Sequence, residues 1–325
     1  MSSHSFPRPR RDAGRFGRPA IAAAVVAALV AIVAAGALLL HTRLGGSARV
    51  LAASGGPPSV LSRAFVGLPL AGRDRDVLIG LGARRDGPVD VVVIPSDESA
   101  VRPADIRVSL GRNTLSGASA ASCGKRCLRF PLAVLAGKAS VVEVEVVRSG
   151  RKNADVRLQI PAQMPPGAES LFHTARARML RLRSLEMNET LGAGLSKPVV
   201  SRWWFQAPDR MRYAIVGGER AVVIGTRRWD AVGRKWQQSS TSRLRFPAFS
   251  WEHARGARLL GRSTLDGVPV RIVAARTPGA DLPTWFLLDV TAHARVLRAR
   301  MLTTAHFMTD TYSRFDSAPA IRPPR

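Results

Sequence analysis

Alternating apolar and polar residues dominate the chain from about residue 61 onward. In residues 140–147 (SVVEVEVV) and 153–161 (NADVRLQIP), every second side chain is apolar, which is typical of strands with one buried face. Further short strands are predicted at 76–83, 89–94 and 105–110, separated by turn residues. The spacing predicts that residues 61–163 form an immunoglobulin-like β-sandwich.

A second domain is predicted over residues 164–325. Pro161, Pro165, Pro166 and Gly167 mark the boundary. Helical spacing of apolar residues predicts a helix from Ala168 to about Leu182. Strands are then predicted at 184–191, 199–208, 211–216, 221–231, 235–239, 268–275, 284–291 and 296–312, with a helix or loop at 251–260. One helix cannot cover both faces of so long a meander, so a sheet curved around the helix is expected.

The N-terminal part predicts a membrane anchor. Residues 21–40 are apolar without a charge or proline, which is the length of a transmembrane helix. Residues 1–20 form an arginine-rich arm that should stay cytoplasmic, so the rest of the chain is expected outside the cytoplasm. A cleavable signal peptide, with a cleavage site near Ala52, Ala53 and Ser54, is the alternative. Residues 41–60 are rich in Gly, Ser and Ala and indicate a flexible tether.

The formal net charge of +26 comes almost entirely from scattered arginines. A generally solvated basic surface is one interpretation. Attraction to anionic lipid headgroups or acidic wall polymers is the other. Nucleic acid is not an expected partner, because the predicted topology separates the basic domains from it.

The two cysteines, Cys123 and Cys127, lie four positions apart in the predicted sandwich. Outside the cytoplasm such a pair is expected to form a disulfide that holds a loop. A Cu(I) site is the alternative, since soft sulfur ligands suit that ion.

Two stretches resemble known families. Residues 87–101 (GPVDVVVIPSDESAV) resemble the small β-sandwich of the YtkA and CopC type, found beside copper-transport membrane proteins. Residues 205–239 (FQAPDRMRYAIVGGERAVVIGTRRWDAVGRKWQQS) are similar to the LolA/LppX-like superfamily of lipoprotein and lipid carriers. The whole arrangement resembles the extracytoplasmic part of actinobacterial copper-resistance proteins of the CopD type. The LolA-like resemblance implies a mainly β half-barrel with a helix at its mouth and an apolar cavity.

Aromatic and apolar side chains of the second domain are the candidates for lining such a cavity. Period two places Trp203 and Phe205 on one strand face, and Met211, Tyr213 and Ile215 on another. Phe172 and Met179 lie on the apolar side of the predicted helix. Either these residues form an ordinary core, or they hold an acyl chain or other apolar ligand whose acidic head meets nearby arginines.

The last predicted strand carries a possible metal site. His306, Met308, Asp310 and Tyr312 alternate with Phe307, Thr309 and Thr311, so the first four share one face. His306 and Met308 would suit copper, whereas a polar rim or a satisfied core histidine is the alternative. The remaining histidines are dispersed, and carboxylates are scarce.

No nucleophile-elbow serine, phosphate-binding glycine loop or zinc-protease helix is present, so an enzyme is not predicted. The leading hypothesis is a membrane-anchored module that binds a lipid, a lipoprotein segment or another apolar ligand. A copper accessory protein, working beside a copper-transport membrane protein, is the second. An extracytoplasmic sensor or interaction protein is the third.

Overall fold

The computed structural model describes residues 70–83, 89–95, 101–124, 127–132, 139–163, 165–192, 197–277, 284–303 and 307–325. The predicted arm, transmembrane segment and tether lie outside these residues. Among the residues described, no helix is both long and apolar enough to span a bilayer.

The first β-rich region consists of two antiparallel sheets. The five-stranded sheet has the order β1-β2-β3-β7-β6, and the four-stranded sheet the order β5-β4-β8-β9. The strand bounds are β1 Leu70–Asp74, β2 Val77–Ala83, β3 Val89–Pro95, β4 Ile106–Leu110, β5 Asn113–Ser116, β6 Ala121–Gly124, β7 Cys127–Phe130, β8 Ser140–Val146 and β9 Ala154–Ile160. In the described part of this region the only helical turns are the short 3-10 segments η1 Pro103–Asp105 and η2 Gly117–Ser119.

One apolar core lies between these two sheets, with side chains from both. In β9, Val156 and Leu158 are buried while Asp155, Arg157 and Gln159 are exposed. All five strands predicted from the alternation are present. Burying one face of each sheet against the other is what period-two sequences require.

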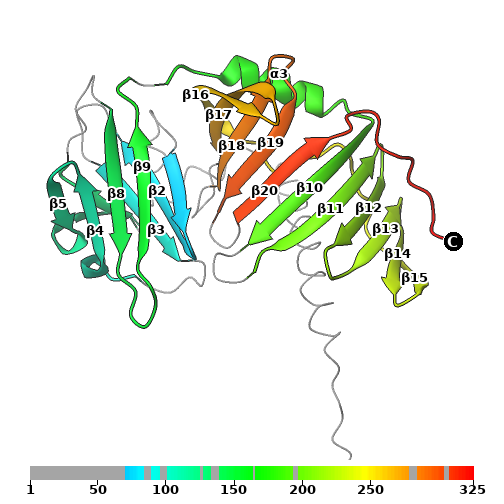
Figure 1. Cartoon of the computed structure of the whole chain (residues 1–325), viewed down its shortest axis with the longest axis horizontal. Coiled ribbons are helices and arrows are strands. Elements are labelled where there is room, and N and C mark those ends of the chain that lie inside the picture. The colour runs from blue at the N-terminus through cyan, green and yellow to red at the C-terminus, as the bar shows by residue number, and fades with distance from the viewer. Residues whose placement is uncertain are drawn as a thin grey trace, which may run out of the picture. The chain divides into compact units, whose positions relative to one another are not determined.

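The second region is one eleven-stranded antiparallel sheet with one α-helix, α3 Glu169–Met179. Its strand order is β15-β14-β13-β12-β11-β10-β20-β19-β18-β17-β16. The strand bounds are β10 Ser184–Gly192, β11 Val199–Gln206, β12 Arg210–Ile215, β13 Arg220–Ile224, β14 Arg227–Val232, β15 Lys235–Ser240, β16 Arg255–Leu265, β17 Val268–Thr277, β18 Thr284–Thr291, β19 Val296–Leu302 and β20 Phe307–Ser313. Figure 1 shows these strands and the helix at one end of them.

Two meanders make this sheet, and they meet where β10 pairs with β20. β10 to β15 run outward in one direction, and β16 to β20 return from the opposite edge. The antiparallel register sets Met187 opposite Tyr312 and Glu189 opposite Asp310. A single pairing between residues more than 100 positions apart therefore makes one continuous sheet from the two meanders.

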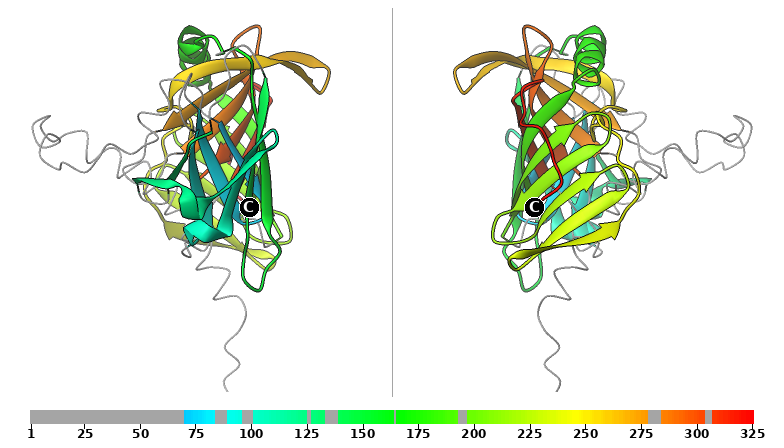
Figure 2. Two further views of the ribbon diagram at one scale, coloured as in Figure 1. Left: turned by 90° about the vertical axis from the view of Figure 1, so that its left-hand side faces the viewer. Right: turned by 90° about the vertical axis from the view of Figure 1, so that its right-hand side faces the viewer.

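The helix α3 packs its apolar side on one face of the sheet, which we call the inner face. Phe172, Ala175 and Met179 are buried in a core with side chains of β17, β18 and β19. The backbone N–H of Ala168 donates to the carbonyl of Ala257 in β16 at 2.9 Å, which fixes the start of the helix. Figure 2 shows the β16–β17 hairpin passing beside the helix. The predicted helix and its apolar side are confirmed.

Two predicted strands are in fact hairpins. Residues 221–231 divide into β13 and β14 at Gly225, whose φ of 62° suits the two-residue turn. Residues 296–312 divide into β19 and β20, with Leu302 opposite Phe307. The second reversal was missed because neither glycine nor proline interrupts the alternation there.

The prediction of a helix or loop at 251–260 is wrong in its second half, where β16 begins at Arg255. Register shifts between Arg255 and Arg258, and between Leu259 and Gly261, interrupt the pairing of β16 with β17. Such β-bulges break the strict alternation by which strands are predicted.

Replacing Met179 by alanine tests the packing of the helix. Met179 is fully buried, so Met179→Ala should leave a cavity and lower the free energy of unfolding by about 2–5 kcal/mol. Val216→Ala is the control, because Val216 is 76% exposed and its loss should change stability by less than about 0.5 kcal/mol. Urea unfolding measures both, and equal effects would contradict this packing.

Candidate functional site

The predicted aromatic candidates lie on the inner face of the sheet. The rings of Trp203 and Phe205 are stacked with centroids 6.2 Å apart, and Trp203 lies 4.7 Å from Tyr213. Met211 and Tyr213 are buried, whereas Ile215 is half-buried. Strand alternation therefore brings these five residues together as predicted.

We call Trp203, Phe205 and Tyr213 the aromatic layer. The segment that follows β15 covers this layer, and no sequence pattern predicted that contact. Phe246, Phe249 and Trp251 follow β15 on the inner face, where Phe246 meets Phe249 edge-on and Phe249 stacks on Trp251. Phe205 stacks on Phe246 at 5.2 Å, and Trp251 contacts Phe172 of α3 edge-on at 6.0 Å. The aromatic side chains therefore pack against one another and against the helix. Their role as ligand contacts stays a prediction.

Two chains of hydrogen bonds end at carboxyl groups within this layer. Trp251 Nε1 donates to the Tyr312 hydroxyl at 3.3 Å, and that hydroxyl donates to Asp310 Oδ2 at 3.1 Å. Next to it, Trp203 Nε1 donates to Ser201 Oγ at 2.7 Å, and Ser201 Oγ donates to Glu189 Oε1 at 3.2 Å. Both chains hold the aromatic layer to the centre of the sheet.

Glu189 and Asp310 are direct cross-strand partners in the centre of the sheet. Asp310 is only 3% exposed. Burial raises the pKa of Asp310 well above its usual range, and the charge of Glu189 raises it further. Burial also raises the pKa of Glu189, against the opposing hydrogen bond from Ser201. Asp310 Oδ1 has no hydrogen-bond partner among the described residues. The scarcity of carboxylates in the sequence did not suggest this buried pair.

The structure describes only some of the proposed copper ligands. Alternation along β20 places Met308 on the face of Asp310 and Tyr312, as predicted, whereas His306 lies outside the described residues. Cys127 is buried and disulfide-bonded, but the side chain of Cys123 is not described. Within the described residues no group of three or more His, Cys, Asp or Glu is arranged to hold a metal. The Cys123–Cys127 disulfide and the copper site both stay predictions.

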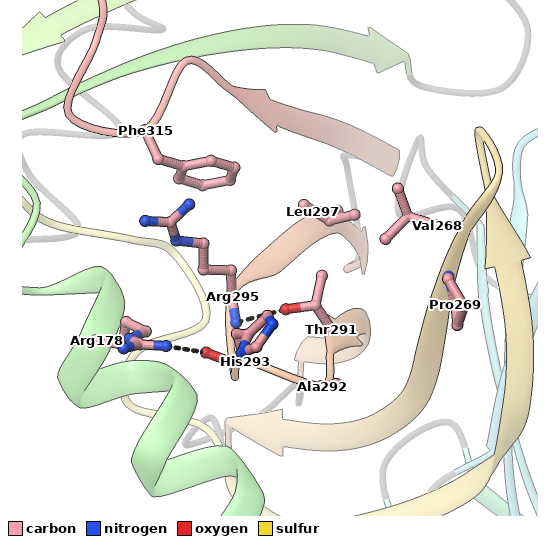
Figure 3. A pocket seen from close by; sticks show the side chains of 9 residues that line it. All are labelled: Arg178, Val268, Pro269, Thr291, Ala292, His293, Arg295, Leu297 and Phe315. Atoms are coloured by element: carbon pink, nitrogen blue, oxygen red, sulfur yellow. Dashed lines mark hydrogen bonds between the residues drawn. The ribbon is translucent and has the colours of Figure 1, made fainter.

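A cleft of about 610 Å³ opens beside the C-terminal end of α3, and we call it the α3 cleft. Figure 3 shows the side chains around it. Apolar groups come from the start of β17, from β19 and from the second residue after β20. These are Val268, Pro269, Leu297 and Phe315. Arg178, His293 and Arg295 supply the polar groups of the lining, together with Thr291.

Hydrogen bonds fix the turn that forms one wall of the α3 cleft. Thr291 and Arg295 are joined by two bonds, from Thr291 N to the Arg295 carbonyl at 2.9 Å and from Arg295 N to Thr291 Oγ1 at 3.1 Å. Arg178 donates from Nη1 to the carbonyl oxygen of His293, which ties the helix to the turn. The wall is therefore built before any ligand arrives.

The charge in the α3 cleft is positive. The Arg295 guanidinium lies 5.1 Å from the centroid of the Phe315 ring, a cation–π distance. Neither Arg178 nor Arg295 takes part in an ion pair with any residue that the structure describes. Apolar walls beside unpaired guanidiniums can hold an apolar body and an anionic head at the same time.

The sequence did not predict the α3 cleft. Its residues come from four places that are far apart in the chain: the end of α3, the start of β17, the β18–β19 turn with the start of β19, and Phe315. The one signal was the positive charge of the turn and of the last turn of α3.

No family model matches the sequence, and no curated protein matches it. Solved structures that resemble this chain include LprF from Mycobacterium bovis, with 12% identity and a TM-score of 0.38 over 49% of this chain and 99% of that one. The lipoprotein LppX from Mycobacterium tuberculosis follows with 11% identity and a TM-score of 0.34, over 47% and 99%. A LolA superfamily protein from Nitrosomonas europaea has 9% identity and a TM-score of 0.25, over 48% and 95%.

These neighbours include the lipoprotein LppX and a LolA superfamily protein. With identities below 25% and TM-scores below 0.5, none of them carries a ligand or an activity over to this chain. The YtkA- and CopC-type sandwich and the copper-resistance context stay predictions.

Replacing Asp310 by asparagine tests the buried carboxyl pair. Because the folded-state pKa of Asp310 is raised, its contribution to stability is complete below about pH 4 and is lost as the pH rises through that pKa. Asp310→Asn cannot ionise. Its free energy of unfolding should therefore fall less between acidic and neutral pH than that of the wild type, by about 1.4 kcal/mol for each unit of pKa shift.

Urea unfolding at a series of pH values measures this difference. Asp266→Asn is the control, since Asp266 is exposed in the β16–β17 turn and asparagine accepts its positive φ of 49°. The free energy of unfolding of Asp266→Asn should depend on pH as that of the wild type does. If Asp310→Asn also kept that profile, Asp310 would be ionised in the folded protein.

Proposed function

We propose that the C-terminal domain is a non-enzymatic binding module whose α3 cleft holds an amphipathic ligand with an apolar body and an anionic head. The observation that carries this proposal is the joint presence of apolar walls and unpaired guanidiniums around one preformed cleft. A lipid or the acylated segment of a lipoprotein has this chemistry.

The size of the α3 cleft supports a ligand with a single chain. Its volume of about 610 Å³ falls within the range of about 300–1,000 Å³ that is usual for sites of one small molecule. Transfer of an apolar chain from water would contribute about 25 cal/mol for each Å² buried. A bond between a guanidinium and a carboxylate would add about 1.5–3 kcal/mol.

The setting of this module is the outer face of a membrane. The apolar residues 21–40 and the arginine-rich arm before them support an uncleaved single-pass anchor with the folded regions outside the cytoplasm. A tether of about twenty residues would keep the domain close to the bilayer. Membrane lipid or a lipoprotein is then the nearest source of ligand.

Calorimetric titration of the delipidated protein with palmitate tests the proposal, and hexadecanol serves as the uncharged analogue. Leu297→Asp places a charge against the apolar body, so it should weaken both ligands at least tenfold. Arg295→Gln removes one guanidinium, so it should weaken palmitate about tenfold or more and leave hexadecanol unchanged.

The matched control for these variants is Arg262→Gln. Arg262 is an exposed arginine of β16 that does not line the α3 cleft. Its replacement should leave both affinities unchanged while removing the same charge. Absence of palmitate binding, or an equal loss in Arg295→Gln and Arg262→Gln, would rule out the α3 cleft as the site.

A further inference from the structure

A second cleft, of about 590 Å³, lies on the other face of the same sheet, and we call it the outer-face cleft. Strand alternation places Trp204 on this face, opposite in direction to Trp203 and Phe205. The lining includes Arg202, Trp204, Arg212, Trp236 and Arg314, together with residues 319–325. The outer-face cleft therefore has no residue in common with the α3 cleft.

The last residues of the chain form a fixed wall of the outer-face cleft. Ile321 is buried against Val222 and Trp229. Its backbone N–H donates to Gln206 Oε1 at 2.9 Å, and its carbonyl accepts from Arg210 Nη1 at 2.9 Å. Side-chain and backbone bonds thus hold the segment on the sheet.

One buried carboxylate, Glu186, orients two of the arginines. It accepts hydrogen bonds from Arg202 Nε at 2.8 Å and from Trp204 Nε1 at 3.1 Å. Arg314 Nε lies 3.3 Å from its second oxygen. Glu186 is 4% exposed, and its oxygens are occupied by these donors. It can neutralise only one of the two guanidinium charges that it positions.

Arg212 adds a further positive charge that no carboxylate balances. Its guanidinium lies 5.1 Å from the centroid of the Trp204 ring, and that of Arg202 lies 4.9 Å from it. In the part of the chain that the structure describes, Arg212 forms no ion pair. Stacking on the indole restricts both side chains, so less conformational entropy is lost when they bind a ligand.

We infer that the outer-face cleft binds a phosphate ester. The lining holds five arginines beside the occupied carboxylate of Glu186. Five guanidiniums favour a ligand with several acceptor oxygens, and planar guanidiniums match phosphate oxygens in pairs. The cleft is larger than a phosphate group needs. Part of its wall is apolar and is formed by Trp236 and Val222. A glycerol or sugar body attached to the phosphate fits this lining. The net charge of +26 attracts such anions from a distance.

Two sources share this chemistry, the headgroup of an anionic phospholipid and a soluble phosphate ester. The full-length protein in detergent micelles is titrated with glycerol 3-phosphate in one arm and with short-chain phosphatidylglycerol in the other. Binding of glycerol 3-phosphate shows that a soluble phosphate ester is sufficient to occupy the outer-face cleft. Binding in the second arm alone identifies the lipid headgroup. Binding in neither arm overturns the inference.

The variants Arg212→Gln and Arg314→Gln assign the binding to this cleft. Each should weaken the phosphate ester at least tenfold, because each removes a charged donor. Arg262→Gln again serves as the control and should bind as the wild type does. All three should keep the wild-type affinity for palmitate, since none touches the α3 cleft. If Arg212→Gln and Arg262→Gln bound the phosphate ester equally, the assignment would be wrong, whatever the palmitate result.

Discussion

The pairing of β10 with β20 is the constraint on which the second region depends. It closes two meanders into one sheet and fixes the register in which Glu189 faces Asp310 and Met187 faces Tyr312. Because neighbouring residues of a strand point to opposite faces, the same register decides which aromatic residues reach the helix and which reach the outer side. A shift of one residue would exchange the two sets. The outer-face cleft depends on this pairing directly, because Arg314, the residue after β20, lies beside Glu186 of β10.

The inner face and the clefts differ in their physical character. On the inner face, aromatic rings fill the space between the sheet and α3, and the carboxyl groups of the buried Asp310 and the half-buried Glu189 are bonded to hydroxyls. This arrangement stabilises a core. In the two clefts, by contrast, guanidiniums stand beside apolar walls without a full complement of carboxylates. Part of the large positive charge therefore lies in the two clefts, where it can attract an anionic ligand.

Periodicity was sufficient to predict most of the fold. Alternation identified five strands of the sandwich, β2, β3, β4, β8 and β9. Helical spacing identified α3 with its buried Phe172 and Met179. It failed where a chain reversal keeps the alternation, as between β19 and β20, and where bulges break it, as in β16. Both failures have one cause, since periodicity reports which face a residue occupies and not where the chain turns.

The sites were harder to predict than the strands. Trp203, Phe205 and Tyr213 do lie together, because they belong to neighbouring strands. The residues that cover them, Phe246 and Trp251, come from a segment without periodicity, so no pattern predicted their position on this face. The α3 cleft is assembled from turns and ends of elements, whose proximity depends on the complete sheet. Positive charge was the one sequence feature that indicated the α3 cleft, and arginines are scattered over the whole sequence.

The most direct test of the central claim is photo-cross-linking of the full-length protein with a palmitate that carries a diazirine on its chain, followed by peptide mapping. Our account predicts labelling in the β18–β19 turn, at Leu297 and at Phe315, and that unlabelled palmitate abolishes it. Labelling concentrated instead on Trp203, Phe205 or Tyr213 would show that the ligand enters the aromatic layer, and would contradict the assignment of the α3 cleft.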